Sequence, residues 1–330
     1  MPKIARLALG FAALTVAGIA FAGTLQAKGT GRLFISNERD HTVTVLEAKT
    51  LEVVKTIPVG RRPRDMQWND DKSKLYVAAS DVDMIQVIDI EKLEVVNEIF
   101  AGDDPELFEI SPDGTTIVAS NEDEDMASFI DIDSEKIFRQ VPTGVEPEGV
   151  SYTADGSQVW VTAEVSQVVH VMDTATGDVY ADILVGNRPR RAVFSPNGKE
   201  YWLANEISAN VHVIDTSTFE IVGEITFEGL KGAPGEVSPV GITMTGDGRT
   251  VFVTLGHANH LAVIDRETRK VRKYLLVGSR AWNTQLTRDN KILYVVNSGS
   301  DDITLIDVEK TKVIKTVPVG RYPHTLRIDD

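Results

Sequence analysis

An all-β ring of seven four-stranded sheets is the fold that the sequence predicts. The chain of 330 residues contains seven similar segments, spaced by 42 residues except for one spacing of 50. Within each segment apolar and polar residues alternate with a period of two, and Gly, Pro and Asp interrupt the alternation, which is typical of strands and turns. Four short strands in about 42 residues is the size of one β-propeller blade, so the predicted fold class is a seven-bladed β-propeller.

Each repeat has the same order of elements. The repeats begin at residues 32, 74, 116, 158, 200, 250 and 292, with sequences such as RLFISN, KLYVAAS and QVWVTAE. After this strand come a polar loop, an alternating strand such as MIQVIDI, a turn that follows an acidic residue, a strand such as EVVKTIPVG, a Gly-x-x-Pro loop, and a strand that ends in SPDG or a variant. A single blade with two apolar faces is marginally stable, so each one needs neighbours.

The inner strand of the first blade is missing from the start of the repeat array. Inner strands are expected at residues 62–69, 104–111, 146–153, 188–195, 238–245, 280–287 and 322–329. The last of these, YPHTLRID, has no repeat after it, whereas the repeat at residue 32 has no inner strand before it. We therefore expect the C-terminal strand to complete the first blade, which closes the ring and leaves no open strand edge.

The first 22 residues predict a secretory signal peptide. Lys3 and Arg6 precede a 16-residue apolar run, and Ala20-Phe21-Ala22 has the form of a signal peptidase site. The expected organisation is a signal peptide at 1–22, a linker at 23–31 and the propeller at 32–330, located in the periplasm or secreted. The uncharged stretch continues to Ala27, so retention as a membrane anchor is the alternative.

Composition excludes several classes of site. The chain contains no cysteine, so disulfides, Cys-ligated zinc or iron–sulfur clusters and covalently attached haem are excluded. The net charge of −15 disfavours nucleic acid and anionic lipid as partners, because both need clustered positive charge. We expect no nucleic-acid partner and no membrane insertion once the signal peptide is cleaved.

Candidate binding residues lie in the loops that enter the inner strands. In a propeller these loops share one face with the loops between the second and third strands, and their sequences vary although the scaffold repeats. Despite the acidic composition they contain eight arginines, at positions 61, 62, 64, 188, 190, 191, 280 and 321. The residues expected to surround the channel mouth as a ligand or partner site are Arg62, Arg64, Glu106, Glu148, Arg188, Arg190, Arg280, Trp282, Tyr322 and His324.

The charged residues of the channel mouth have two possible interpretations. Neighbouring Arg and Glu side chains can neutralise one another and join adjacent blades. Alternatively, a negative sector flanked by positive ones accepts an anion, with Arg giving bidentate contacts to carboxylates and Trp282 a stacking surface. Pyrroloquinoline quinone (PQQ), a polycarboxylate, would suit the second interpretation chemically, although no cofactor is predicted.

Other candidate features carry less information. His257 and His260 are weak candidates for metal ligands, and no metal site is predicted. Glu122, Asp123, Glu124 and Asp125 lack the EF-hand pattern and are expected in a solvated turn. The extra length of the fifth repeat, near 230–237, is either a lid or docking loop or a tolerated surface insertion. No catalytic residue is predicted, since no nucleophile elbow, phosphate-binding loop or HExxH motif occurs.

The motifs LYVAAS, VWVTAE, LYVVNS, VIDT and VGxxPxxxxFSPDG resemble the YVTN-type β-propeller repeat over residues 32–330. Seven such repeats behind a signal peptide are similar to the propeller proteins associated with PQQ-dependent catabolism. That resemblance implies a non-catalytic periplasmic protein that binds a small anion or a protein partner, either a quinoprotein dehydrogenase or a component of an associated transport system, in alcohol oxidation. The alternative is an enzyme of the lactonase or quinoprotein-dehydrogenase-subunit type that uses the channel mouth.

Overall fold

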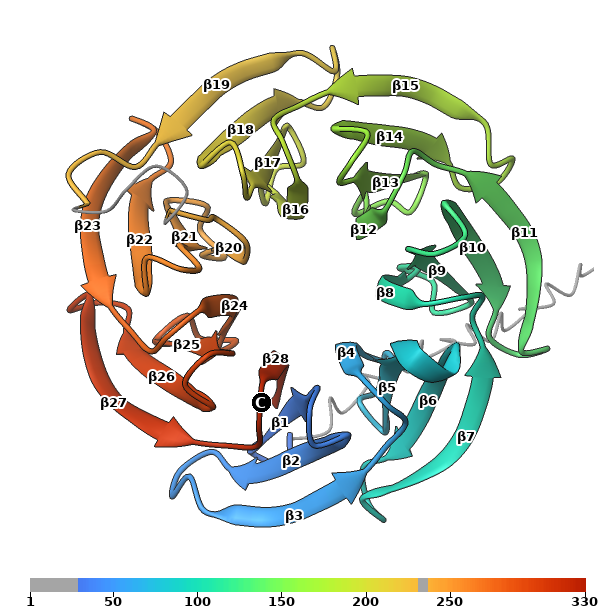
Figure 1. The fold of residues 1–330 in the computed structure, drawn as a ribbon, viewed down its shortest axis with the longest axis horizontal. Coiled ribbons are helices and arrows are strands. Elements are labelled where there is room, and N and C mark those ends of the chain that lie inside the picture. The colour runs from blue at the N-terminus through green and yellow to red at the C-terminus, as the bar shows by residue number, and fades with distance from the viewer. Residues whose placement is uncertain (1–28, 231–236) are drawn as a thin grey trace, which may run out of the picture.

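The chain folds into an all-β, seven-bladed propeller, as the repeat predicts (Figure 1). The structure, a computed structural model, describes residues 29–230 and 237–330. The expected signal peptide, most of the expected linker and most of the insertion lie outside these ranges. Within them the only helix is a 3-10 turn at Ser80–Val82, and no helix is long and apolar enough to cross a membrane.

Each blade is a four-stranded antiparallel sheet whose strands are named here from the channel outward. Blade 1 contains β28 (Pro323–Asp329), β1 (Arg32–Asn37), β2 (Thr42–Glu47) and β3 (Val53–Pro58), and blade 2 contains β4 (Pro63–Trp68), β5 (Lys74–Ala79), β6 (Met84–Asp89) and β7 (Glu94–Phe100). Blade 3 contains β8 (Pro105–Ile110), β9 (Thr116–Asn121), β10 (Met126–Asp131) and β11 (Lys136–Pro142), and blade 4 contains β12 (Pro147–Tyr152), β13 (Gln158–Ala163), β14 (Val168–Asp173) and β15 (Val179–Leu184).

In the same order, blade 5 contains β16 (Pro189–Phe194), β17 (Glu200–Asn205), β18 (Asn210–Asp215) and β19 (Ile221–Thr226). Blade 6 contains β20 (Ile242–Met244), β21 (Thr250–Thr254), β22 (His260–Asp265) and β23 (Lys270–Leu276), and blade 7 contains β24 (Ala281–Leu286), β25 (Ile292–Asn297), β26 (Asp302–Asp307) and β27 (Lys312–Pro318). The short β20 is a difference from the sequence prediction of a full inner strand at 238–245. Backbone hydrogen bonds continue before β20, from the Val240 N–H to the Thr254 carbonyl at 3.2 Å and from the Thr254 N–H to the Gly241 carbonyl at 2.9 Å, so part of the expected segment still pairs with β21.

The ring is closed by β28, as predicted. This C-terminal strand pairs antiparallel with β1, and the two strands lie side by side in Figure 1. The register joins Leu33 to Ile328 and Arg32 to Asp329. Beyond the strand, the backbone N–H of Thr30 donates to the Asp329 carboxylate at 2.7 Å. Closure removes a strand edge that would otherwise be free to pair with another chain.

Apolar side chains fill the space between neighbouring blades. Both faces of the second and third strands are buried, whereas the outer strands are mostly exposed or half-buried, with at most one buried residue near the end of each. Between blades 1 and 2, for example, Phe34, Val43, Met66, Val77 and Ile88 form one cluster. The two apolar faces of each sheet explain why the fold needs a full ring of neighbours.

A repeated hydroxyl group also links successive blades near the channel. In the second strands of blades 3 and 4, Ser120 and Thr162 accept a hydrogen bond from the inner strand of their own blade, at 3.1 and 2.7 Å. The same hydroxyls donate to the inner strand of the next blade, at the carbonyls of Glu148 (2.6 Å) and Arg190 (3.1 Å). Each bridge therefore fixes the position of an inner-strand residue that points toward the axis.

Candidate functional site

Seven structurally equivalent residues surround the axis one position after the Gly-x-x-Pro proline or its counterpart. They are Arg64, Glu106, Glu148, Arg190, Val240, Trp282 and His324, and all are buried. We call them the mouth ring. Their side chains reach beyond adjacent blades: Arg64 of blade 2 lies 3.7 Å from Glu148 of blade 4, and the Arg190 guanidinium of blade 5 lies 5.3 Å from the Trp282 ring centroid of blade 7. Side chains therefore fill the channel at this level.

Two buried arginines organise the charges of the ring. Arg64 forms ion pairs with Glu106, with Glu38 at 3.3 Å and with Glu148 at 3.7 Å. Arg190 pairs with Glu164, with Glu148 at 3.2 Å and with Glu206 at 2.7 Å. Glu148 is shared by both arginines and joins the two halves of the network.

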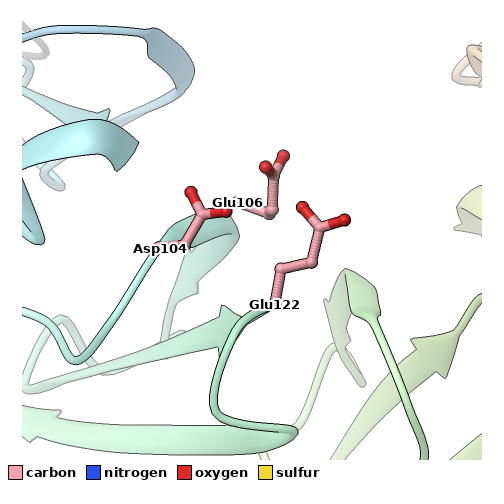
Figure 2. Close-up of side chains that lie close together, drawn as sticks. All are labelled: Asp104, Glu106 and Glu122. Carbon is pink, nitrogen blue, oxygen red and sulfur yellow. The ribbon is translucent and has the colours of Figure 1, made fainter.

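A second layer lies between the ring and solvent. Arg62, which is partly exposed, pairs with Glu106, with Asp104 at 2.7 Å and with Glu122 at 3.6 Å. Figure 2 shows these three carboxylates gathered together, and their oxygens lie within 4.8 Å of one another. They are the only group in the described residues with spacing suited to a metal ion. Because the Arg62 guanidinium contacts all three, the protein supplies the cation itself.

The ion pairs agree with the first interpretation of the mouth for four arginines. Arg62 and Arg64 cross from blade 2 into the carboxylates of blade 3, and Arg188 pairs with Glu164 at 2.8 Å, so positive and negative side chains interleave instead of forming separate sectors. Arg280 differs, because it forms no ion pair with any residue described. Its guanidinium lies over Trp282 and Tyr322, at 4.7 and 5.4 Å from the ring centroids.

Two aromatic candidates are less accessible than the sequence implied. Trp282 is buried, and the guanidinium groups of Arg190 and Arg280 lie over its ring, so it is not an open stacking surface. His324 is buried too, and its Nδ1 lies 3.0 Å from the Thr325 hydroxyl. Burial lowers the pKa of His324 well below its ordinary value, with a further contribution from Arg64, so this imidazole is neutral.

Four glutamates of the network occupy one position of the repeat, directly after the second strand. They are Glu38, Glu122, Glu164 and Glu206, in the sequences SNE, SNE, TAE and ANE. The sequence analysis singled out only Glu122 of these four, as part of an acidic run expected in a solvated turn. The recurrence of Glu at this one repeat position is a signal that could have identified all four.

The glutamates of the network differ in the direction of their pKa shifts. Burial raises the pKa of Glu164 to about 8, and repulsion from Glu148 adds to the effect against the attraction of Arg190. Burial likewise raises the pKa of Glu106 well above its ordinary value. Burial also disfavours the charged form of Glu148, but Arg190 and Arg64 outweigh it and lower the pKa of this carboxyl. Glu148 is therefore the ionised centre of the network.

The weak metal candidates do not converge. His257 contacts Ser238, with its Nδ1 at 3.3 Å from the hydroxyl, and His260 contacts the carbonyl of Ala258 at 2.6 Å. Neither histidine belongs to a group of metal-type ligands within residues 29–230 and 237–330. Arg191, which the sequence grouped with the mouth arginines, points instead into the channel beyond the ring and contacts Asp65 at 3.5 Å.

Fold and site together define a seven-bladed β-propeller whose mouth ring is closed by ion pairs. Two family models match parts of the chain: "Lactonase, 7-bladed beta-propeller" at residues 180–317 and "YNCE-like beta-propeller" at residues 70–156. The chain is similar to these families over those segments. A search of curated proteins finds no match.

Solved structures share the fold at low sequence identity. A hydrazine synthase from Kuenenia stuttgartiensis matches with a TM-score of 0.77 and 22% identity, over 84% of this chain and 92% of that chain. A functionally unknown protein from Desulfotomaculum acetoxidans matches with a TM-score of 0.77 and 17% identity, over 91% and 99%. The dihydro-heme d1 dehydrogenase NirN matches with a TM-score of 0.69 and 14% identity, over 90% and 75%. At these identities the likeness shows the fold alone.

Proposed function

We propose that this protein is a non-catalytic, exported propeller that docks a partner protein on its mouth face, as an accessory to PQQ-dependent alcohol catabolism. The resemblance of the YVTN-type repeats supports the pathway, and the partner class that it implies is a quinoprotein dehydrogenase or a transport component. The observation that carries the docking role is an acidic rim beside exposed apolar side chains on the mouth face.

The acidic rim extends over blades 2 to 4. The mouth-face loops at 59–62, 80–83, 101–104, 122–125 and 143–146 contain just two basic residues, Arg61 and Arg62. Their acidic residues are all at least partly exposed: Asp81, Asp83, Asp103, Asp104, Glu122, Asp123, Glu124, Asp125 and Glu146. Such a surface attracts a basic partner and speeds its association.

An apolar patch adjoins the rim on blades 4 and 5. Val145, Val165 and Ile207 are 45%, 55% and 62% exposed, in loops of the same face. Val165 and Ile207 line a hollow of about 220 Å³ together with Arg188 and Glu164. A hollow lined by exposed aliphatic side chains and by charged groups can accept an anchoring side chain of a partner protein. We infer a partner segment that combines Lys or Arg with an apolar side chain.

A small anion fits this mouth less well than a protein does. Arg62, Arg64, Arg188 and Arg190 already contact acidic side chains, so a ligand such as PQQ would have to displace these internal contacts. Arg280, which lies over Tyr322 and forms no ion pair among the described residues, is the mouth arginine that an anion could contact without displacing an acidic side chain. Calorimetry with PQQ, comparing the wild type with Arg280→Gln, tests this second ligand class.

An enzyme of the lactonase type is the second candidate function. The match of the lactonase family model to residues 180–317 favours it, and Glu164, with its pKa raised to about 8, could carry a proton in such a reaction. Turnover of a simple lactone that falls in Glu164→Gln would support this candidate over a binding protein.

Charge reversal on one blade tests the docking proposal. Asp103 and Asp123 are exposed on the mouth face of blade 3, and Asp133 is exposed in a turn on the opposite face of the same blade. We expect Asp103→Lys/Asp123→Lys to lose the dehydrogenase or transport component from a periplasmic pull-down, whereas Asp133→Lys retains it. Equal recovery by both variants would contradict docking at the mouth.

A further inference from the structure

A second polar site lies inside the channel, beyond the mouth ring. A cavity of about 370 Å³ is lined by inner-strand residues that follow the ring positions, among them Asp65, Gln67, Glu109, Arg191, Thr284 and Arg327. None of the mouth-ring side chains lines it. The volume falls in the range of small-molecule pockets, and the lining comes from inner strands around the axis.

Two arginines in this cavity share one carboxylate. The guanidinium nitrogens of Arg191 and Arg327 lie 3.5 and 3.2 Å from the same oxygen of Asp65, which is buried. The other Asp65 oxygen accepts a hydrogen bond from the Gln67 amide at 3.1 Å. Two positive groups against one negative group leave an excess of one positive charge among largely buried side chains, which favours an anion.

The remaining carboxyl in the lining, Glu109, cancels that excess only in part at neutral pH and less at lower pH. Burial raises the pKa of Glu109 to about 7, and a carboxylate oxygen of Glu109 accepts a hydrogen bond from the backbone N–H of Tyr152 at 2.7 Å. Below this pH the Glu109 carboxyl is mostly neutral. The cavity then contains one carboxylate, two guanidinium groups and one carboxylic acid.

An orphaned hydroxyl also points to a ligand. Thr284 is 5% exposed and lines the cavity, yet its Oγ1 has no hydrogen-bond partner among the residues that the structure describes. A buried hydroxyl without a partner is costly, so a native structure normally satisfies it with water or a ligand. The indole N–H of Trp68, also in the lining, is unpartnered in the same way.

We propose that the channel cavity binds a small hydroxy-monocarboxylate, with its carboxylate between Arg191 and Arg327 and its hydroxyl at Thr284. A single negative charge matches the single excess positive charge, and planar guanidinium groups suit carboxylate recognition. This site is independent of the docking surface on the mouth face. Its ligand is a small monocarboxylate, whereas the ligand proposed for the mouth face is a protein.

Calorimetry on the mature protein at pH 6 tests the proposal, with lactate, glycerate and gluconate as probes. The controls are glycerol, which is uncharged, and citrate, which carries more than one negative charge. We expect one of the monocarboxylates to bind, glycerol not to bind and citrate to bind at least tenfold more weakly. Thr284→Val keeps the shape of the side chain and should weaken binding about fivefold to tenfold. Arg61→Gln, at an exposed mouth position, should leave the affinity unchanged.

Arg327→Gln should abolish binding, and its thermal melting curve shows whether the variant folds. If Arg327→Gln does not fold, the affinity of Thr284→Val tests the proposal instead. The proposal is overturned if the folded wild type gives no heat with any monocarboxylate at millimolar concentration, if glycerol or citrate binds as tightly as the monocarboxylates, or if Thr284→Val binds as the wild type does. Failure of partner docking would not affect any of these results.

Discussion

At the scale of single residues, Glu148 is the charge on which the mouth ring depends most. It lies between the guanidinium groups of Arg64 and Arg190, and all three side chains are buried. Removing one member of a buried ion pair is strongly destabilising, because the partner charge stays in a medium of low dielectric. The two arginines have other carboxylates, so the loss should be large without abolishing folding.

We predict that Glu148→Gln lowers the free energy of unfolding by about 3 kcal/mol. The matched control is Glu146→Gln in the same loop, which is partly exposed and has no ion pair among the described residues. Its effect should stay within about 0.5 kcal/mol. Urea unfolding of both variants measures the difference, and equal stabilities would show that the shared carboxylate does not support the ring.

A pH dependence follows from Glu164. Its pKa is raised to about 8 in the folded protein from 4.5, so the folded state binds the proton more tightly. The resulting stabilisation is complete below pH 4.5 and is lost as the pH rises through about 8. Glu106 changes in the same direction. We therefore expect melting temperature to fall between pH 6 and pH 9, and to fall less in Glu164→Gln than in the exposed control Glu220→Gln. Parallel pH profiles for these two variants would contradict the assignment.

At the scale of elements, β28 joins the last repeat to the first blade. Its pairing with β1 follows from the number of repeats, and this closure could be predicted from the sequence because inner strands are recognisable after each Gly-x-x-Pro loop. The truncated β20 could not be predicted. Thr254 makes the same hydroxyl contact that Thr162 makes beside the full-length β12, so this contact does not explain the short strand.

Deleting residues 321–330 should sharply destabilise the protein. The deletion removes β28, exposes the β1 edge and uncovers Leu33 and Ile35, which pack with Leu326 and Ile328. Arg321→Ala keeps the strand and removes an exposed side chain, so it should melt close to wild type. Thermal melting compares the three proteins. A melting temperature of the truncated chain near that of the wild type would argue against ring closure by β28.

At the scale of the whole molecule, the repeat determines where variable loops gather, and side-chain geometry determines what they can bind. The sequence identifies the mouth-ring positions because they recur at fixed offsets from Gly-x-x-Pro. It does not show that Arg190 reaches Trp282 past the intervening blade, or that Arg62 lies among three carboxylates. Those contacts depend on rotamers and on the radius of the ring. The channel cavity was missed for the same reason, since Arg191 is adjacent in sequence to Arg190 but points elsewhere.

The mouth face is the proposed protein-docking surface, and native mass spectrometry of the protein co-purified from periplasm tests this role most directly. We expect a complex with a quinoprotein dehydrogenase or a transport component, lost in Val165→Asp and retained in Val179→Asp. Both side chains are exposed on blade 4, but Val179 begins the outer strand β15, beside a turn on the opposite face. A wild-type spectrum with no partner, or a complex that survives Val165→Asp, would contradict the account.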